Sequence, residues 1–305
     1  MATIGVDLGA TKLSAAIFGE DGLILSRTGI KTEGQGGEEL GRLILAQVRK
    51  LMLEAFQSGI EIEGIGLCVP GIYHQSSGTV WAPNIPGWDN YPLGKELCGA
   101  FSGLGLSIRI ESDRTCYILG ESWCGVAKGS SNAIYLSVGT GIGAGILCDG
   151  HIIRGAADIA GAVGWMALAG SYLGKYRDCG CFEYHASGSG LVKCAGEKIS
   201  GKFKDAKEII DAFNAGDPLA EELLDTAVKM WGMASANLIS IFNPEILVFG
   251  GGIFGPAATL LPRIRQEASL WAQPVSMKQV RFAVTSLAGD AGLMGAGRLP
   301  LVERL

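Results

Sequence analysis

Two stretches of the chain decide the fold: VDLGATKLSAAI at residues 6–17 and LSVGTGIGAGIL at residues 136–147. Each is an apolar run interrupted by a short glycine-containing bend, and aligning the two pairs Gly9 with Gly139. Both stretches then lead to an Asp-Gly turn and a further apolar strand. Two β-hairpins with the same glycine at the bend predict a duplicated architecture.

The repeat extends beyond the hairpins. IGLCVPG at residues 65–71 in the first half corresponds to ILVFGGG at residues 246–252 in the second. Both read as buried strands that run into a turn. Helical periodicity is found over 37–56, and again after Asp217 and Pro218, which are typical of an N-cap and a first helical position. This alternation predicts two α/β domains, with limits expected at 1–115 joined by 290–305, and at 116–289.

A segment of 17 residues, IYHQSSGTVWAPNIPGW at 72–88, follows the first buried strand. It is expected to be a long loop without regular structure. Loops of that length in compact domains are usually binding loops.

Composition excludes several classes of protein. The net charge is −5 without a basic block, so no nucleic-acid partner is expected. No run of 18 apolar residues and no secretory leader are seen, so we expect a cytoplasmic protein without a membrane partner. The 47 glycines have no three-residue period, and they suggest turns where backbone approaches a ligand. In such a protein most of the eight cysteines are expected to be small buried residues.

The two glycine bends are suited to phosphate. In DLGATK the backbone N–H groups, the Thr11 hydroxyl and Lys12 can form one concave donor site, although a plain hairpin turn is the alternative. The Walker pattern is absent. GTGIGAG at 139–145 satisfies GxGxxA, but the residues after it continue as strand and turn. A dinucleotide fingerprint requires a helix there, so the Rossmann interpretation is disfavoured.

DLGATK, GTGIGAG, NPEILVFGGGI and the ending LAGDAGLMGAG together resemble the sugar kinases of the ROK family, over essentially the whole chain. The resemblance implies two actin-like ATPase (ribonuclease H-like) α/β domains with a cleft between them. It also implies ATP and Mg²⁺, a sugar acceptor and a homodimer. Many ROK repressors carry an N-terminal DNA-binding domain, whereas here the kinase-like part starts at residue 3, so that kind of repressor is not expected.

The resemblance places the catalytic base at Asp113, in IESDRTCYILGE. A carboxylate at a strand end can accept the proton of an attacking hydroxyl. Asp113 as the N-cap of the following helix is the alternative, and both roles are compatible. Asp7 is expected near Mg²⁺, through water. The ATP-binding residues expected from the resemblance and the glycine bends are Gly9, Thr11, Lys12, Gly139, Thr140, Gly141, Gly251 and Gly252.

The acceptor residues implied by the resemblance are Gly71, Asn84, Ser112 and Glu183, but the site departs from the family pattern. Ala162 and Trp165 replace the family's glutamate and histidine, and Ser112 replaces an asparagine. We therefore expect an acceptor other than glucose or a standard N-acetylhexosamine, or one bound weakly. Trp165 can stack on an apolar sugar face.

A structural zinc ion is not expected. In the segment that holds zinc in the family, Gly174 and Tyr176 stand at two cysteine positions, and only Cys181 remains as a ligand. One ligand of four cannot hold zinc. Cys179 is then expected to be a packing residue.

Three function classes stay open from the sequence. The first is an ATP-dependent kinase of a sugar or sugar-like hydroxyl compound. The second is a catalytically weak sensor of a sugar or nucleotide, which the lost contacts favour. The third is an actin-like ATPase that activates a redox enzyme, with Cys179 or Cys181 holding an iron–sulfur cluster between subunits.

Overall fold

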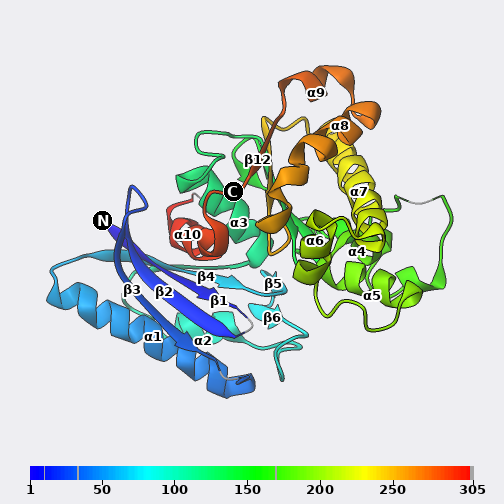
Figure 1. The fold of residues 1–305 in the computed structure, drawn as a ribbon. Helices are drawn as coiled ribbons and strands as arrows, with labels where there is room; N and C mark the ends of the chain where they lie inside the picture. Colours follow the sequence, from blue (N-terminus) through cyan, green and yellow to red (C-terminus); the bar gives the residue numbers. More distant parts are fainter. Residues whose placement is uncertain (10, 33, 169, 303–305) are drawn as a thin grey trace. The chain divides into compact units, whose positions relative to one another are not determined.

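The computed structural model describes residues 1–9, 11–32, 34–168 and 170–302. Contacts divide the chain into two units, coloured along the sequence in Figure 1. The first unit contains Met1–Gly129, Arg154–Ala160 and the described residues from Gly289 onward; the second contains Ser130–Ile153 and Gly161–Ala288. The limits expected from the sequence assign residues 116–129, 154–160 and 289 to the second domain, whereas this division places them in the first unit.

Each unit is built on a five-stranded sheet with the same topology. In the first, β1 pairs antiparallel with β2 and parallel with β4, and in the second β8 pairs antiparallel with β9 and parallel with β11. The duplication predicted from the two hairpins is therefore confirmed. The strand orders are β3(Ile24–Lys31)-β2(Lys12–Gly19)-β1(Ala2–Leu8)-β4(Ile62–Val69)-β7(Ser107–Ser112) and β10(His151–Ile152)-β9(Ile142–Cys148)-β8(Ala133–Val138)-β11(Ile246–Gly250)-β12(Arg281–Val284).

The first sheet is covered on both faces. Helix α1 (Gly37–Gln57) lies along one face and α10 (Ala291–Arg298) along the other, as Figure 1 shows. The amphipathic helix predicted over 37–56 is confirmed, since its buried residues recur at helical spacing. The other helices of this unit are α2 (Leu93–Ala100) and α3 (Asp113–Cys124).

The C-terminal helix expected over 290–305 is shorter in the structure. Helix α10 ends at Arg298 and a 3-10 turn covers Leu299–Leu301, while residues 303–305 lie outside the described residues. The helix contacts the sheet closely: the Thr3 hydroxyl donates to the Gly297 carbonyl at 2.7 Å. Sequence-distant ends of the chain thus complete one core.

In the second unit, α7 (Pro218–Phe242) is the longest helix. The Asp217 side chain accepts the N–H groups of Leu219 and Ala220, both at 3.0 Å, and Asn243 ends the helix at φ +46°. The N-cap and the end predicted from the sequence are confirmed. The other helices are α4 (Cys181–Ala186), α5 (Gly188–Lys198), α6 (Ala206–Asn214), α8 (Leu261–Trp271) and α9 (Pro274–Gln279).

The segment 72–88 is not the irregular loop expected from the sequence. It contains a small hairpin of β5 (Ile72–His74) and β6 (Thr79–Trp81). Gly78, at φ +70°, donates its N–H to the His74 carbonyl at 2.9 Å and closes the turn. Alternation over three-residue strands is too short a signal to reveal such a hairpin.

Among the described residues, no helix has the length and apolar character needed to span a bilayer.

Candidate active site

The first phosphate candidate is the β1–β2 bend. The Gly9 N–H donates to the Lys12 carbonyl at 2.9 Å, and the Thr32 N–H to the Thr11 carbonyl at 3.1 Å. Thr11 and Lys12 are exposed, so their side chains are accessible to a ligand. Ala10, at the centre of the predicted bend, lies outside the described residues.

A group of carboxylates lies at the carboxyl ends of the strands of the first sheet. Burial, together with the nearby carboxylates of Asp113 and Asp290, raises the pKa of Asp7 to about 6, although a hydrogen bond with Cys68 and the Arg27 charge oppose the rise. Parallel strands β1, β4 and β7 end at the same edge of the sheet, which explains why these groups meet. The expected position of Asp7 near Mg²⁺, through water, stays a prediction.

Arg27, Asp290 and Gly292 belong to this site, although sequence reasoning did not single them out. Arg27 Nη1 and Nη2 bind the two Asp290 carboxylate oxygens at 2.8 and 2.5 Å, and this pairing keeps the pKa of Asp290 below its usual range. A methyl group added at Gly292 would lie 2.9 Å from each Asp7 carboxylate oxygen. The Asp7 carboxylate therefore faces the first turn of α10.

Asp7 is expected to make the ligand-free protein less stable above about pH 6. The pKa of Asp7 is about 6 in the folded chain, against an ordinary value of 3.8. Between these two pH values the folded state therefore binds more protons than the unfolded state. The free energy of unfolding contributed by Asp7 is present below pH 3.8 and is lost as the pH rises through about 6. Replacing Asp7 with Asn removes the charge that burial disfavours, so the variant should be more stable than wild type at pH 8.

Urea unfolding of wild type and Asp7→Asn at pH 5 and pH 8 measures this effect. The stability gained by the variant over wild type should be larger at pH 8, where Asp7 is charged. An equal difference at both pH values would show that Asp7 ionises as an ordinary surface carboxyl.

Asp113 lies at the start of α3, directly after the end of β7. Its Oδ1 accepts the Arg114 N–H at 2.8 Å, the Tyr117 hydroxyl is 3.5 Å from Oδ2, and burial raises its pKa. The N-cap alternative for Asp113 is wrong, because the N-cap residue is Ser112 and Asp113 is the first helical residue. The Ser112 hydroxyl pairs instead with the Thr115 hydroxyl at 3.2 Å.

Two other predicted acceptor residues lie in the first unit. Gly71 has φ +105°, and a Cβ there would overlap the Trp81 carbonyl, so this turn requires glycine. Asn84 is exposed, in the segment between β6 and α2.

The second phosphate candidate is the β8–β9 bend. Because β9 follows as an antiparallel strand, the rejection of a dinucleotide fingerprint is confirmed. The Gly139 N–H donates to the Gly141 carbonyl at 2.9 Å. A Cβ at Gly139 would lie 3.8 Å from the Gly252 nitrogen, and one at Gly251 would lie 2.5 Å from the Val138 carbonyl, so the two glycine turns adjoin.

The start of α5 also contacts this bend, a feature without a distinctive sequence signal. The Gly188 N–H donates to the Gly139 carbonyl at 2.7 Å, and the Ser189 hydroxyl to the Thr140 carbonyl at 2.6 Å. In both bonds a carbonyl group of the bend is the acceptor, so the start of α5 fixes the backbone of the bend. The predicted residues 139–141 and 251–252 are thus brought together.

Glu183 supports the same bend. Its Oε2 accepts the Ile142 N–H at 2.6 Å, and a Cβ at Gly141 would lie 2.7 Å from that oxygen. Burial raises the pKa of Glu183, while the Ile142 N–H opposes the rise. Glu183 therefore has a role in holding the hairpin, and its predicted contact with sugar hydroxyls stays a prediction.

Trp165, in a 3-10 turn over Val163–Trp165, is 57% exposed. A Cβ at Gly180, which has φ +80°, would lie 2.5 Å from the Trp165 Cα, so the two segments that depart from the family pattern adjoin. The exposed indole is available for stacking.

The segment around Cys179 and Cys181 packs through aromatic contacts. The Tyr176 hydroxyl pairs with His185 Nε2 at 2.8 Å, and both rings contact Tyr184. Within the described ranges, no group of three or more His, Cys, Asp or Glu side chains is arranged to hold a metal ion. Cys179 packs, partly buried, against the core, as expected.

All eight cysteines are free. The expectation that most of them are buried is met only by Cys68, Cys116 and Cys181, because Cys124, Cys148, Cys179 and Cys194 are half-buried. It is wrong for Cys98, which is exposed on α2, because an apolar sequence neighbourhood does not determine which helix face a residue occupies.

Comparison with known proteins identifies the class. The chain is 31% identical to a glucokinase of Thermotoga maritima over 99% of its length and 98% of that protein. A ROK hexokinase of Thermus thermophilus, 31% identical, superposes with a TM-score of 0.82 over 97% of both chains. A Streptomyces griseus glucokinase solved in complex with glucose and AMPPNP is 28% identical, with a TM-score of 0.73 over 98% of this chain and 99% of that one.

These similarities define an ATP-dependent sugar kinase with the actin-like ATPase fold, and Mg²⁺ is the usual partner of ATP in this class. The ROK family model matches residues 3–302. The chain belongs to the ROK family.

Proposed function

We propose that this protein transfers the γ-phosphoryl group of ATP to a hydroxyl of a sugar or sugar-like acceptor, with Asp113 as general base. The observation that carries the proposal is the position of Asp113 directly after the carboxyl end of β7, at the edge of the sheet where the parallel strand β1, which carries Asp7, also ends. The acceptor oxygen bonds to the γ-phosphorus as the bond to the β–γ bridging oxygen breaks. ADP leaves, and the acceptor proton passes to Asp113.

The binding of ATP is assigned to the two glycine bends. In the first unit, Gly9, Thr11 and Lys12 supply donors to phosphate oxygens. In the second unit the donors come from residues 139–141 and from Gly251 and Gly252; a Cβ at Gly252 would meet no atom within 4 Å. Mg²⁺, when bound, neutralises phosphate charge, and Asp7 is the residue proposed to hold it through water.

The acceptor is assigned to Gly71, Asn84 and Ser112 in the first unit, and to Glu183 and Trp165 in the second. The relatives named as glucokinases put glucose among the first acceptors to test. The replacement of polar family residues by Ala162, Trp165 and Ser112 supports a different acceptor, or a weakly bound one. A homodimer and a cytoplasmic location stay predictions.

Screening ATP consumption over a panel of sugars tests the proposal. The panel contains glucose, mannose, fructose, xylose and the three N-acetylhexosamines, each with and without Mg²⁺. We expect Mg²⁺-dependent ADP release with at least one acceptor, and a weak response to glucose. Best turnover on glucose or N-acetylmannosamine at low KM would contradict the acceptor proposal, whereas no turnover with any sugar would contradict the kinase proposal.

The second candidate is a sensor that binds a sugar without turning it over. It is supported by the loss of polar side chains at 162 and 165, where a bound sugar would otherwise be oriented for transfer. Isothermal titration with the same sugars distinguishes the two: a sensor binds a sugar that it does not phosphorylate.

A further inference from the structure

A short loop belongs to the first unit although the segments before and after it in the sequence belong to the second. After β10 the chain leaves the second unit, contributes Arg154–Ala160 to the first, and returns to the second at Gly161. The Ala160 N–H donates to the Arg154 carbonyl at 2.9 Å, which closes the loop at its base. We call these seven residues the 154–160 loop. Two of its side chains, those of Arg154 and Asp158, bond to other residues of the first unit.

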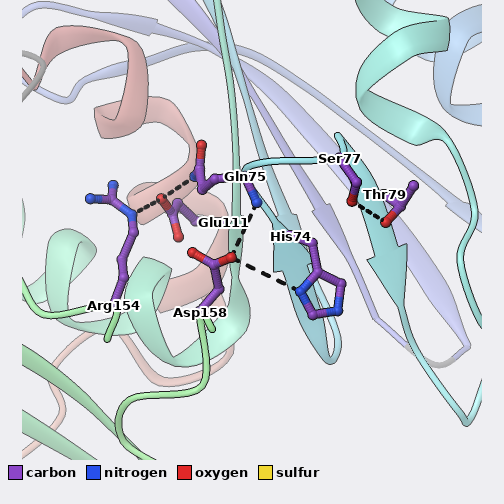
Figure 2. Close-up of polar contacts among 7 residues, drawn as sticks. All are labelled: His74, Gln75, Ser77, Thr79, Glu111, Arg154 and Asp158. Atoms are coloured by element: carbon purple, nitrogen blue, oxygen red, sulfur yellow. Dashed lines mark hydrogen bonds and ion pairs between the residues drawn. The ribbon is translucent and has the colours of Figure 1, made fainter. Parts of the chain in front are cut away.

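Arg154 and Glu111 form the main anchor of the loop, shown in Figure 2. Arg154 Nε binds Glu111 Oε1 at 2.6 Å, and Gln75 Nε2 binds the same oxygen at 3.0 Å. Glu111 is only 6% exposed, and burial raises its pKa while the Arg154 charge opposes the rise. Because a buried carboxylate without a cation is strongly disfavoured, Glu111 depends on Arg154.

Asp158 forms the second anchor. Its Oδ2 accepts the Gln75 N–H at 3.2 Å and lies 4.0 Å from His74 Nδ1 (Figure 2). Asp158 has φ +59°, a conformation that a non-glycine residue adopts at some cost. Gln75 therefore links both anchors, through its main chain to Asp158 and through its side chain to Glu111.

The anchors reach two segments proposed to carry the acceptor. Glu111 directly precedes Ser112 and is two residues before Asp113, at the end of β7. His74 is the last residue of β5 and Gln75 follows it, while β5 begins directly after Gly71. The 154–160 loop thus contacts Gln75, directly after β5, and Glu111, in β7, and these two strands lie next to Gly71 and contain Ser112, respectively.

We propose that Arg154 is a positioning residue for the acceptor, acting through Glu111 and Gln75 to hold the ends of β5 and β7 in one arrangement. This inference rests on the proposed kinase function. In the described part of the chain, the bonds of the two anchors join the 154–160 loop to Glu111, Gln75 and His74 rather than to the ATP-binding bends. The loss of Arg154 should therefore weaken the binding of the sugar and leave the binding of ATP unaffected.

The test compares Arg154→Ala, Arg154→Lys and Glu111→Gln with wild type, using the sugar of the panel with the highest kcat/KM. In Arg154→Ala the KM for the sugar should rise at least about tenfold, while the KM for ATP changes less than about twofold. Lysine keeps the charge and should restore part of the affinity. Adding Glu111→Gln to Arg154→Ala should cause no further rise, because both changes break the same contact.

Arg263→Ala is the matched control. It breaks the Arg263–Asp225 pair, at 2.6 Å, on an exposed surface of the second unit, and both KM values should stay at wild-type levels. Hydrogen exchange provides a readout that is independent of activity. The amides of residues 72–76 and 154–160 should exchange faster in Arg154→Ala and remain unchanged in Arg263→Ala.

The outcomes separate this inference from the proposed function. An active wild type whose sugar KM is unchanged by Arg154→Ala overturns the positioning role alone. Equal rises in the KM for sugar and for ATP also overturn it, because they indicate general damage to the fold. A wild type that phosphorylates no sugar overturns the proposed function, and the positioning role with it.

Discussion

Replacing Asp113 with Asn is expected to lower kcat by about 10²–10⁴-fold, because the amide cannot accept the proton of the attacking hydroxyl. The KM for ATP should change little, since the glycine bends are intact. The folded structure should also persist, because the Asn side-chain oxygen can still accept the Arg114 N–H that Asp113 Oδ1 binds at 2.8 Å. Steady-state kinetics with the best sugar, together with a thermal melt, measure both effects.

The pH profile gives a second readout of Asp113. Burial raises its pKa, and a general base works in its deprotonated form, so kcat should rise with pH through that elevated pKa. The residual activity of Asp113→Asn should lack this rise. Asp89→Asn, on an exposed loop, is the control and should behave as wild type. Equal ATP consumption by wild type and Asp113→Asn with every sugar would exclude Asp113 as the base.

Gly295→Ala is expected to destabilise the protein by about 3 kcal/mol or more, because a methyl group there has no room. A Cβ at Gly295 would overlap the Cys116 carbonyl of α3, and one at Gly120 of α3 would lie 2.5 Å from the Ala291 carbonyl of α10. Helices α3 and α10 therefore touch backbone to backbone, and backbone atoms cannot move aside as a flexible side chain can. The midpoint of thermal unfolding should fall by roughly 6 °C or more.

Gly99→Ala is the matched control for this experiment. Gly99 lies in α2 of the same unit, and a Cβ there meets no atom within 4 Å. The change should stabilise the protein by about 0.5–1 kcal/mol, because alanine loses less backbone freedom on folding. Urea unfolding measures both variants. Wild-type stability in Gly295→Ala would show that the two helices separate more easily than their contact implies.

Gly295→Ala should also reduce activity through Asp7. The Asp7 carboxylate faces Gly292 in the first turn of α10, so a shift of this helix displaces the proposed Mg²⁺ site. The loss should affect kcat more than the KM for the sugar. This separates it from the effect expected of Arg154→Ala, where the sugar KM changes.

Much of the architecture was determined by the sequence alone. The hairpins at residues 6–17 and 136–147, the buried strands after them and the periodicity of α1 and α7 are local patterns, and each predicted its element. The duplicated architecture followed from aligning Gly9 with Gly139, while the order of the strands came from the structure. The sequence also predicted which residues form each bend, because a hairpin brings residues that are close in the sequence close together in space.

Only the tertiary structure decided the contacts between sequence-distant residues. Arg27 binds Asp290 across 263 positions, and Arg154 binds Glu111 across 43, and no local pattern marks either pair. The hairpin β5–β6 was missed because three-residue strands carry too little periodicity. The limits expected from the sequence place residues 154–160 in the second domain, whereas in the structure they belong to the first unit, where Arg154 binds the buried Glu111. A bend forms from its own residues, whereas a charge pair forms only when the whole chain has folded around it.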